Sequence, residues 1–158
     1  MGLCQRRYPQ RVHADAPGPE VTVELSAPAR HFVVCGDNPL AYRLVDELVT
    51  QYDAHVAAIF PTTRTSWADK ISQIPGVTLV ESDRLDAGAF SRADLAHADA
   101  IALVHQEDSG NVDAALLAQE INPGVRIVIR MFNLSLGERM SALLNDCAVL
   151  SAAAIAAP

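Results

Sequence analysis

Short apolar runs alternate with segments of helical periodicity along most of this chain. The apolar runs lie at residues 31–35, 55–60, 77–80, 99–104, 125–131 and 147–150. Between them, apolar side chains recur at steps of three and four residues, the spacing of one helix face, at residues 39–52, 67–74, 86–97, 111–121 and 136–144. The pattern therefore predicts six strands alternating with five helices.

The predicted strands are almost continuously apolar, which is typical of parallel strands covered on both faces. Pro75-Gly76 and Asn122-Pro123-Gly124 are strong stop signals that end two of the helices. Strands that alternate with helices are joined by right-handed crossovers. The predicted fold class is therefore α/β: a Rossmann-like, doubly wound, six-stranded and mainly parallel sheet with helices on both faces.

The two ends of the chain differ from this regular part. Residues 1–28 are expected to form an irregular lead, because the first twenty residues hold three prolines and no apolar run. Within the lead, Val21–Leu25 alternates and is either an edge strand or a linker. Residues 29–158 are expected to form one domain. Ser151–Pro158 resembles the start of a seventh element, so we expect a piece of a longer protein; the alternative is a frayed natural terminus.

Composition narrows the class of protein. The length of 158 residues suits one domain, and 12 basic against 19 acidic side chains give a net charge of −7, which argues against a nucleic-acid partner. Cys4, Cys35 and Cys147 are far apart, so neither a metal site nor a disulfide framework is expected. No apolar run approaches the roughly 20 residues of a membrane span. A cytoplasmic protein without direct membrane insertion fits best.

The turn after the first predicted strand is the first candidate site. Gly36-Asp37-Asn38-Pro39-Leu40-Ala41 follows the dinucleotide-binding pattern G-x-G-x-x-G/A at its first and last positions. Asn38 stands where a glycine would let the backbone approach a pyrophosphate. Asp37 adds a carboxylate that competes with phosphate for the positive end of the helix. The match is therefore degenerate.

Phe60, at the end of the second predicted strand, and Arg64, just beyond it, have two interpretations each. Phe60 stands where dinucleotide-binding domains usually carry an acid for the ribose hydroxyls. Its ring could stack on a base, although a core residue at the strand end is the more common case. Arg64 could meet a phosphate, although a solvated surface position is the more common one for an arginine in a polar loop.

Four segments together resemble one known family: HFVVCGDNPLAYRLVDEL, VTLVESDRLDAGAF, HADAIALVHQEDSGNVDAALLAQEINPGVRIVIRMFN and MSALLNDCAVLSAAA. In order and spacing they resemble the regulatory RCK, or TrkA N-terminal, domains of potassium channels and transporters, over about residues 30–155. The resemblance implies a Rossmann-type domain that binds NAD(H) or an adenine nucleotide (ATP, ADP or AMP). It also implies a membrane pore or transporter subunit as partner, and a homodimer or higher homo-oligomer.

The resemblance also implies which residues bind the nucleotide. The phosphate turn would include Gly36, Asn38 and Leu40, and the ribose position Phe60. The adenine side would be formed by Asp83 and Arg84, although the family carries Ala-Thr where this chain has Arg84-Leu85. The remaining contacts would come from Val104, His105 and Gln106 at the fourth strand tip, from Arg130 at the fifth, and from Asn111, which would begin the next helix. With the turn residues Asp37 and Pro39 and with Arg64, these form the predicted site.

Three of these residues have alternative roles. Arg84 and Arg130 could together bind phosphates by forked hydrogen bonds. Alternatively, Arg130 pairs with Glu107 or Asp108 across neighbouring strand tips. His105 is expected to be a structural residue rather than a metal ligand, because no carboxylate spacing supports a metal.

The sequence thus predicts a nucleotide-sensing regulatory domain that controls ion transport and has no catalytic residues. No G-x-S-x-G, H-E-x-x-H or Walker motif occurs. Two alternatives stay open. One is a degenerate scaffold domain that binds no nucleotide. The other is the cofactor domain of a larger NAD(P)-dependent dehydrogenase, since this chain is too short to hold a substrate domain as well.

Overall fold

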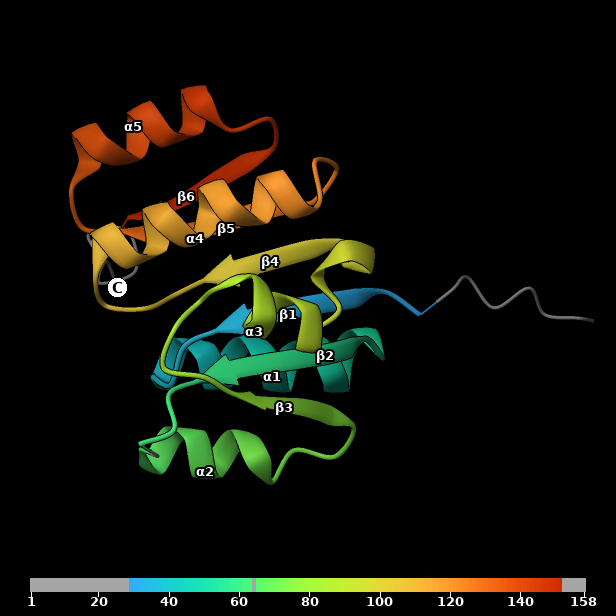
Figure 1. Ribbon diagram of the computed structural model, residues 1–158. Coiled ribbons are helices and arrows are strands. Elements are labelled where there is room, and N and C mark those ends of the chain that lie inside the picture. Colours follow the sequence, from blue (N-terminus) through green and yellow to red (C-terminus); the bar gives the residue numbers. More distant parts are fainter. Residues whose placement is uncertain (1–28, 64, 152–158) are drawn as a thin grey trace, which may run out of the picture.

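Six parallel strands form the centre of the molecule (Figure 1). The structure is a computed structural model that describes residues 29–63 and 65–151. The strands are β1 (His31–Cys35), β2 (His55–Phe60), β3 (Val77–Glu81), β4 (Ala100–Leu103), β5 (Arg126–Met131) and β6 (Cys147–Ser151). They lie in the order β3-β2-β1-β4-β5-β6, and every neighbouring pair is parallel. This confirms the predicted Rossmann-like sheet.

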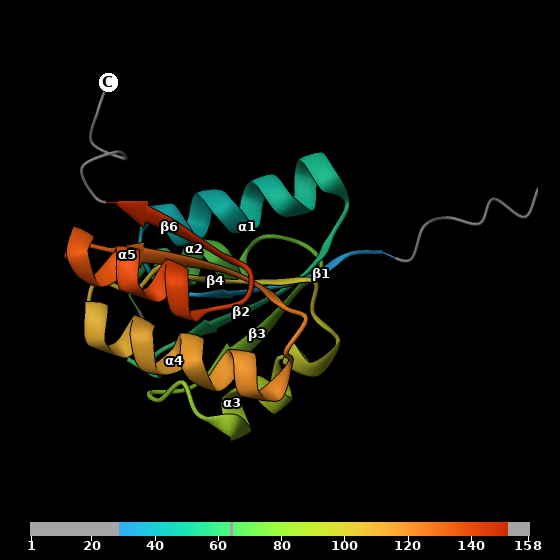
Figure 2. The same ribbon diagram turned by 90° about the horizontal axis from the view of Figure 1, so that it is seen from above.

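Helices cover the sheet in two layers (Figure 2). One face packs against α1 (Pro39–Tyr52) and α2 (Ser66–Ser72). The other face packs against α3 (Ala87–Arg92), α4 (Asp108–Ile121) and α5 (Leu134–Leu143). The layers follow from the right-handed crossovers, because the chain moves one way across the sheet from β1 to β3 and the other way from β4 to β6.

The core consists of two apolar clusters, one on each face. We call the cluster under α1 and α2 the α1 cluster, and the one under α3, α4 and α5 the α4 cluster. In strand β2, Val56, Ala58 and Phe60 belong to the α1 cluster, whereas Ala57 and Ile59 belong to the α4 cluster. All five residues are almost completely buried. A strand covered on both faces needs apolar side chains at every position, which is the pattern that the sequence carries.

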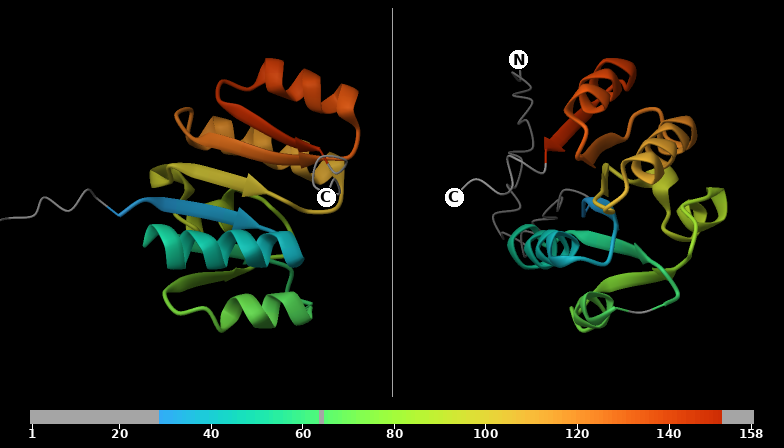
Figure 3. Two further views of the ribbon diagram at one scale, coloured as in Figure 1. Left: turned by 180° about the vertical axis from the view of Figure 1, so that it is seen from behind. Right: turned by 90° about the vertical axis from the view of Figure 1, so that its left-hand side faces the viewer.

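The direction of winding reverses between β1 and β4. These strands are neighbours in the sheet although the whole β2–β3 region separates them in the chain. Seen from the carboxyl ends of the strands, the connections after β1 and β4 diverge to opposite faces (Figure 3). In open α/β sheets, ligands bind in the crevice at such a reversal, and the fold therefore locates the candidate site.

The structure corrects two of the predicted helices. Residues 86–97 form α3 and a separate 3₁₀ turn, Leu95–His97, instead of one helix. Asp94 interrupts the helix because its backbone takes the left-handed conformation, with φ of 55°. Helix α4 begins at Asp108, so the expectation that Asn111 begins it is wrong by three residues. Ser151 belongs to β6, and both the lead and the proposed seventh element lie outside the described residues.

Neither described cysteine forms a disulfide. Cys35 lies at the end of β1 with no exposed surface, and burial raises the pKa of its thiol well above the ordinary range. Cys147, in the edge strand β6, is half-buried, and burial raises the pKa of its thiol as well. In residues 29–63 and 65–151, no helix is both long enough and apolar enough to cross a membrane.

A glycine sets the distance between α5 and the edge of the sheet. A Cβ atom at Gly137 would lie 2.9 Å from Val149 Cγ1 and 3.5 Å from the Cβ of Met131. We expect Gly137→Ala to destabilise the fold by about 1–3 kcal/mol in urea denaturation, because the added methyl overpacks this contact.

The matched control is Gly110→Ala in α4, where an added Cβ has no neighbour within 4 Å. Because alanine favours a helix over glycine, this change should stabilise by about 0.5–1 kcal/mol. Stabilisation of similar size by both changes would contradict the tight contact at Gly137.

Candidate functional site

A cleft of about 580 Å³ opens at the carboxyl ends of the strands, at the β1–β4 reversal. The segments after β1, β3 and β4 line it together with the first two turns of α4 and the residue before α2. The lining residues are Asp37, Asn38, Thr65, Asp83, Arg84, Leu85, His105, Gln106, Glu107, Gly110, Asp113 and Ala114. Segments far apart in sequence thus meet at one edge of the sheet.

Gly36 makes the sharp turn out of β1 possible. Its φ of 152° lies in a region that side chains rarely allow, and a Cβ atom there would come within 3.0 Å of Val104 Cγ2. Its N–H donates to the carbonyl of Ile59, at 3.0 Å. Glycine is therefore required here by the turn and by the close packing of β1 against β4.

Asn38 joins the turn to the neighbouring strand. Its Oδ1 accepts a hydrogen bond from the Ala41 N–H at 3.0 Å, which caps the N-terminus of α1. Its Nδ2 donates to the carbonyl of Val104 at 2.6 Å. The side chain is 5% exposed, so both ends of the amide are fixed on the floor of the cleft.

Asp83 ties together the loops that follow β2 and β3. Its Oδ1 accepts hydrogen bonds from the Thr62 N–H and hydroxyl, each at 2.8 Å, and its Oδ2 lies 2.9 Å from the same hydroxyl. These hydrogen bonds lower the pKa of the Asp83 carboxyl. Asp83 therefore stays ionised at neutral pH and faces the cleft as an acceptor.

The tip of β4 forms the opposite wall. His105 lies there half-buried, and desolvation lowers the pKa of its imidazole against the opposing effect of Asp37 and Glu107. The ring is therefore neutral at pH 7. Beneath it, the Asn111 Nδ2 donates to the carbonyls of His105 and Arg130, at 3.0 and 2.9 Å, and holds the tips of β4 and β5 together.

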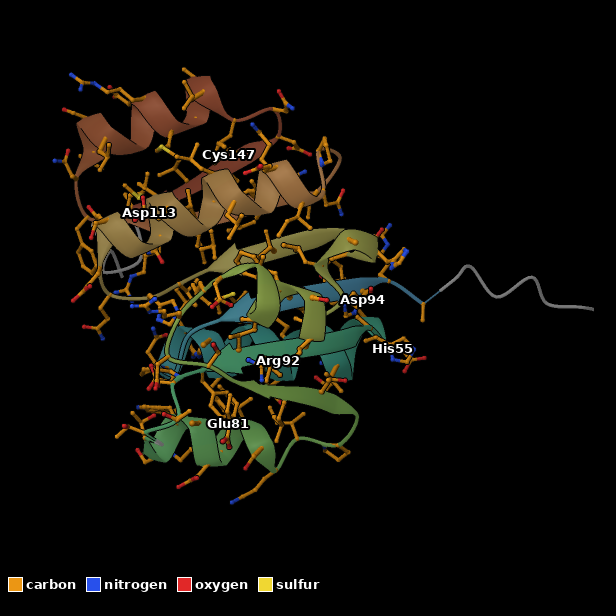
Figure 4. All side chains as sticks on the ribbon, viewed as in Figure 1. His55, Glu81, Arg92, Asp94, Asp113 and Cys147 are labelled. Carbon is orange, nitrogen blue, oxygen red and sulfur yellow. The ribbon has the colours of Figure 1, made fainter. Side chains whose placement is uncertain are left out.

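The cleft is acidic. Asp37, Asp83, Glu107 and Asp113 place carboxylates around it, and among the described lining residues only Arg84 carries a permanent positive charge. Figure 4 shows Asp113 on the half of α4 near the carboxyl ends of the strands, whereas His55 and Asp94 lie at the opposite edge of the sheet. The electrostatic field of these residues favours neutral or cationic ligand groups over anions.

The structure places six of the predicted site residues in the cleft lining: Asp37, Asn38, Asp83, Arg84, His105 and Gln106. Gly36 shapes the turn without lining the cleft. Pro39 is exposed at the first position of α1, and Leu40 is half-buried against the α1 cluster. Arg64 lies outside the described residues.

Three further predicted residues are completely buried instead of lining the cleft. Phe60 has no exposed surface and packs among the apolar residues under α1 and α2. Of its two interpretations the core residue is therefore the one that the structure shows, and its ring does not face the cleft. Val104 is completely buried, and its link to the site is its backbone carbonyl, which accepts the hydrogen bond from Asn38. Asn111 is also completely buried and acts as the brace between β4 and β5.

The ion pair predicted for Arg130 is absent from the described chain, and its phosphate-binding role stays a prediction. Its guanidinium lies 4.9 Å from the centre of the Phe132 ring, outside the cleft lining, and it forms no ion pair within the described chain. Asp108, one of its two expected partners beside Glu107, instead accepts hydrogen bonds from the backbone N–H groups of Phe132 and Asn133, at 2.9 and 2.8 Å. The carboxylate is thus used in fixing the turn after β5.

Sequence reasoning missed six lining residues: Thr65, Leu85, Glu107, Gly110, Asp113 and Ala114. The last three lie on the first two turns of α4, and Glu107 immediately precedes it. Had the start of α4 been set at Asp108, the helical spacing of Gly110, Asp113 and Ala114 would have placed them on one face. Within the described ranges, no group of three or more His, Cys, Asp and Glu side chains could hold a metal ion.

Comparison with known proteins identifies the family. The model of the TrkA-N domain matches residues 32–149. The chain belongs to the TrkA-N domain family. A search of curated proteins finds no match to this TrkA-N domain.

Solved structures share its fold at low sequence identity. The TrkA-N domain of the Escherichia coli inner membrane protein ybaL is 17% identical, with a TM-score of 0.64 over 77% of this chain and 87% of that one. A Shewanella denitrificans Kef C-terminal domain in AMP-bound form is 13% identical, with a TM-score of 0.60 over 77% and 71%. The GsuK channel bound to NAD is 17% identical, with a TM-score of 0.60 over 77% of this chain and 22% of that one.

The Thr62–Asp83 contact gives a test of the site geometry. In Thr62→Val the hydroxyl hydrogen bonds are lost, so the pKa of Asp83 should rise toward its ordinary value of 3.8. Because the folded-state pKa lies below the unfolded one, this contact stabilises the wild type at neutral pH and its contribution disappears as the pH falls through the folded pKa. Carboxyl NMR titration measures the shift.

Thr50→Val is the control, because the Thr50 hydroxyl donates to the backbone carbonyl of Asp46 and not to a carboxylate. It should leave the Asp83 titration unchanged. An Asp83 titration that is the same in wild type and Thr62→Val would contradict the hydrogen-bond assignment.

Proposed function

We propose that this TrkA-N domain is the ligand-binding regulatory part of an ion-transport system and that its cleft binds NAD(H) or an adenine nucleotide through the adenosine part. The observation that carries the proposal is the polar cleft at the β1–β4 reversal. The same fold binds AMP in the Kef domain and NAD in the GsuK channel. In this proposal the chain is not itself an enzyme and acts at the cytoplasmic side of a membrane pore or transporter subunit.

The cleft suits an adenosine group chemically. Its lining combines apolar surface from Leu85 and Ala114 with hydrogen-bonding groups on Asp83 and Gln106. Asp83 is an ionised acceptor, which suits an exocyclic amino group or a ribose hydroxyl.

The two halves of the sheet both contribute to the cleft. Asp37 and Asp83 follow strands on the β1–β3 side, while His105 and the start of α4 belong to the β4–β6 side. A ligand that contacts both sides stabilises one relative arrangement of these loops. Ligand binding then regulates transport only as far as the two states of the assembly differ in affinity for it.

A second candidate function is a scaffold domain that binds no nucleotide. The specific observation in its favour is the occupied N-terminus of α1, where Asn38 takes the Ala41 N–H that a phosphate would need. Calorimetric titration with adenosine, AMP, ADP and NADH separates the two functions. If the domain is a scaffold, none of these four ligands should bind with a dissociation constant below about 1 mM.

A bulky residue in the cleft tests ligand binding directly. Gln106 is exposed at the tip of β4, so Gln106→Trp should preserve the fold and fill the cleft, weakening adenosine or AMP binding by about tenfold or more in calorimetric titration. The control is Gln51→Trp, at the exposed end of α1 on the opposite edge of the sheet. Equal affinity in both variants would place the ligand elsewhere.

The same pair of variants tests regulation. Potassium or rubidium uptake by cells that carry Gln106→Trp in place of the wild-type residue should lose its response to the ligand, whereas Gln51→Trp should behave as the wild type. If Gln106→Trp abolishes ligand binding but leaves uptake and its response to the ligand unchanged, the transport role is contradicted. The assignment of the ligand to the cleft would still stand.

We also propose that the domain works as a homodimer or a larger homo-oligomer. Two leucines on the helices of one face support this, because Leu116 of α4 is 41% exposed and Leu143 of α5 is 64% exposed. An association surface on this helix face would bury both side chains.

The double variant Leu116→Asp/Leu143→Asp should convert the assembly to monomers in light scattering, because association would bury both carboxylates without partners. Tyr52→Asp, at the exposed end of α1 on the other face, is the control. An unchanged molar mass in the double variant would exclude this helix face from the interface.

A further inference from the structure

We propose that the cleft selects an uncharged adenine nucleoside over its phosphate esters, and that Asn38 and Asp37 are the residues that set this preference. The inference rests on the proposed function, because it takes the adenosine group as the bound part. It concerns the position at the N-terminus of α1 where dinucleotide-binding domains hold phosphate.

Three of the four residues from Pro39 to Tyr42 have no backbone N–H free for a ligand. Pro39, the first residue of α1, has no N–H to offer. The Ala41 N–H donates to Asn38 Oδ1, and the Tyr42 N–H donates to the carbonyl of Asn38, at 3.1 Å. Of the residues from Pro39 to Tyr42, this leaves at most the Leu40 N–H for a phosphate oxygen.

Asn38 cannot move aside without loss. Its Nδ2 bond to the Val104 carbonyl, at 2.6 Å, lies almost completely out of water. Displacing the side chain would leave a buried carbonyl without a donor, which costs more than an exposed hydrogen bond. The amide therefore acts as a built-in substitute for the phosphate that related sites take from the ligand.

The charges around the turn act in the same direction. The Asp37 carboxylate lies next to Asn38, and Glu107 and Asp113 border the same cleft. Asp83 stays ionised because its hydrogen bonds with Thr62 lower its pKa. Among the described lining residues, the guanidinium of Arg84 carries the one permanent positive charge. Each phosphate added to the ligand therefore meets more repulsion than attraction.

The test is a ligand series on the wild-type protein. Calorimetric titrations with adenosine, AMP, ADP and NAD⁺ at constant ionic strength should give the tightest binding for adenosine. The affinity should fall about fivefold for each negative charge that the phosphate groups add. Raising the salt concentration should narrow these differences, because salt screens the repulsion. Adding Mg²⁺ should leave ADP weaker than adenosine.

Two variants assign the preference to its residues. Asp37→Asn removes one carboxylate from a half-exposed side chain and should narrow the gap between adenosine and ADP by about fivefold. Asn38→Gly should open the N-terminus of α1 and improve ADP and NAD⁺ binding relative to adenosine. Thermal unfolding checks that Asn38→Gly still folds, and Asp37→Asn carries the test if it does not. Asp46→Asn, on α1 away from the cleft, should change neither ratio.

The outcomes separate this inference from the proposed function. If ADP or NAD⁺ binds the wild type as tightly as adenosine, with or without Mg²⁺, the inference is overturned while the nucleotide site stands. If Asp37→Asn leaves the adenosine-to-ADP ratio unchanged, the assignment to Asp37 is overturned. If wild type and variants bind none of the four ligands, the proposed function and the inference are both overturned.

Discussion

The side chain of Asn38 connects the two halves of this molecule. One end of its amide caps α1, and the other holds the carbonyl of Val104 just beyond β4. The connections that follow β1 and β4 diverge at this point, and this hydrogen bond joins the turn after β1 to the opposite wall. Gly36 lets the backbone come close enough for the bridge, because a side chain there would press against Val104. The shape of the cleft therefore depends on one buried amide.

The same principle recurs around the carboxyl edge of the sheet. Asn111 bridges the carbonyls after β4 and at the end of β5, and Asp108 binds two backbone N–H groups of the turn after β5. Each of these side chains satisfies backbone groups that the ends of parallel strands leave unpaired. A site built in this way has little freedom to adapt, and recognition depends on which backbone groups remain available to a ligand.

The sequence predicted the sheet well because its signals are local. Residues 55–60 are apolar at every position since both faces are covered, and Pro39 marks the start of α1 by its missing N–H. The site was predicted less completely, because its contacts join distant segments. Strand parity directs Phe60 into the core under α1, and Asp108 binds a turn more than twenty residues away. Neither relation is visible until the strands are placed side by side.

Cys35 allows opening of the protein core to be measured by thiol modification. Its sulfur lies on β1, between β2 and β4, with no exposed surface and a raised thiol pKa. The side chain packs in the apolar cluster under α3, α4 and α5. A thiol reagent can reach it only when this helix layer opens, so the rate of modification reports the free energy of that opening. Ligands that bridge both sides of the cleft would slow this reaction. The chain thus carries its own probe of how firmly the helices of this face cover the sheet.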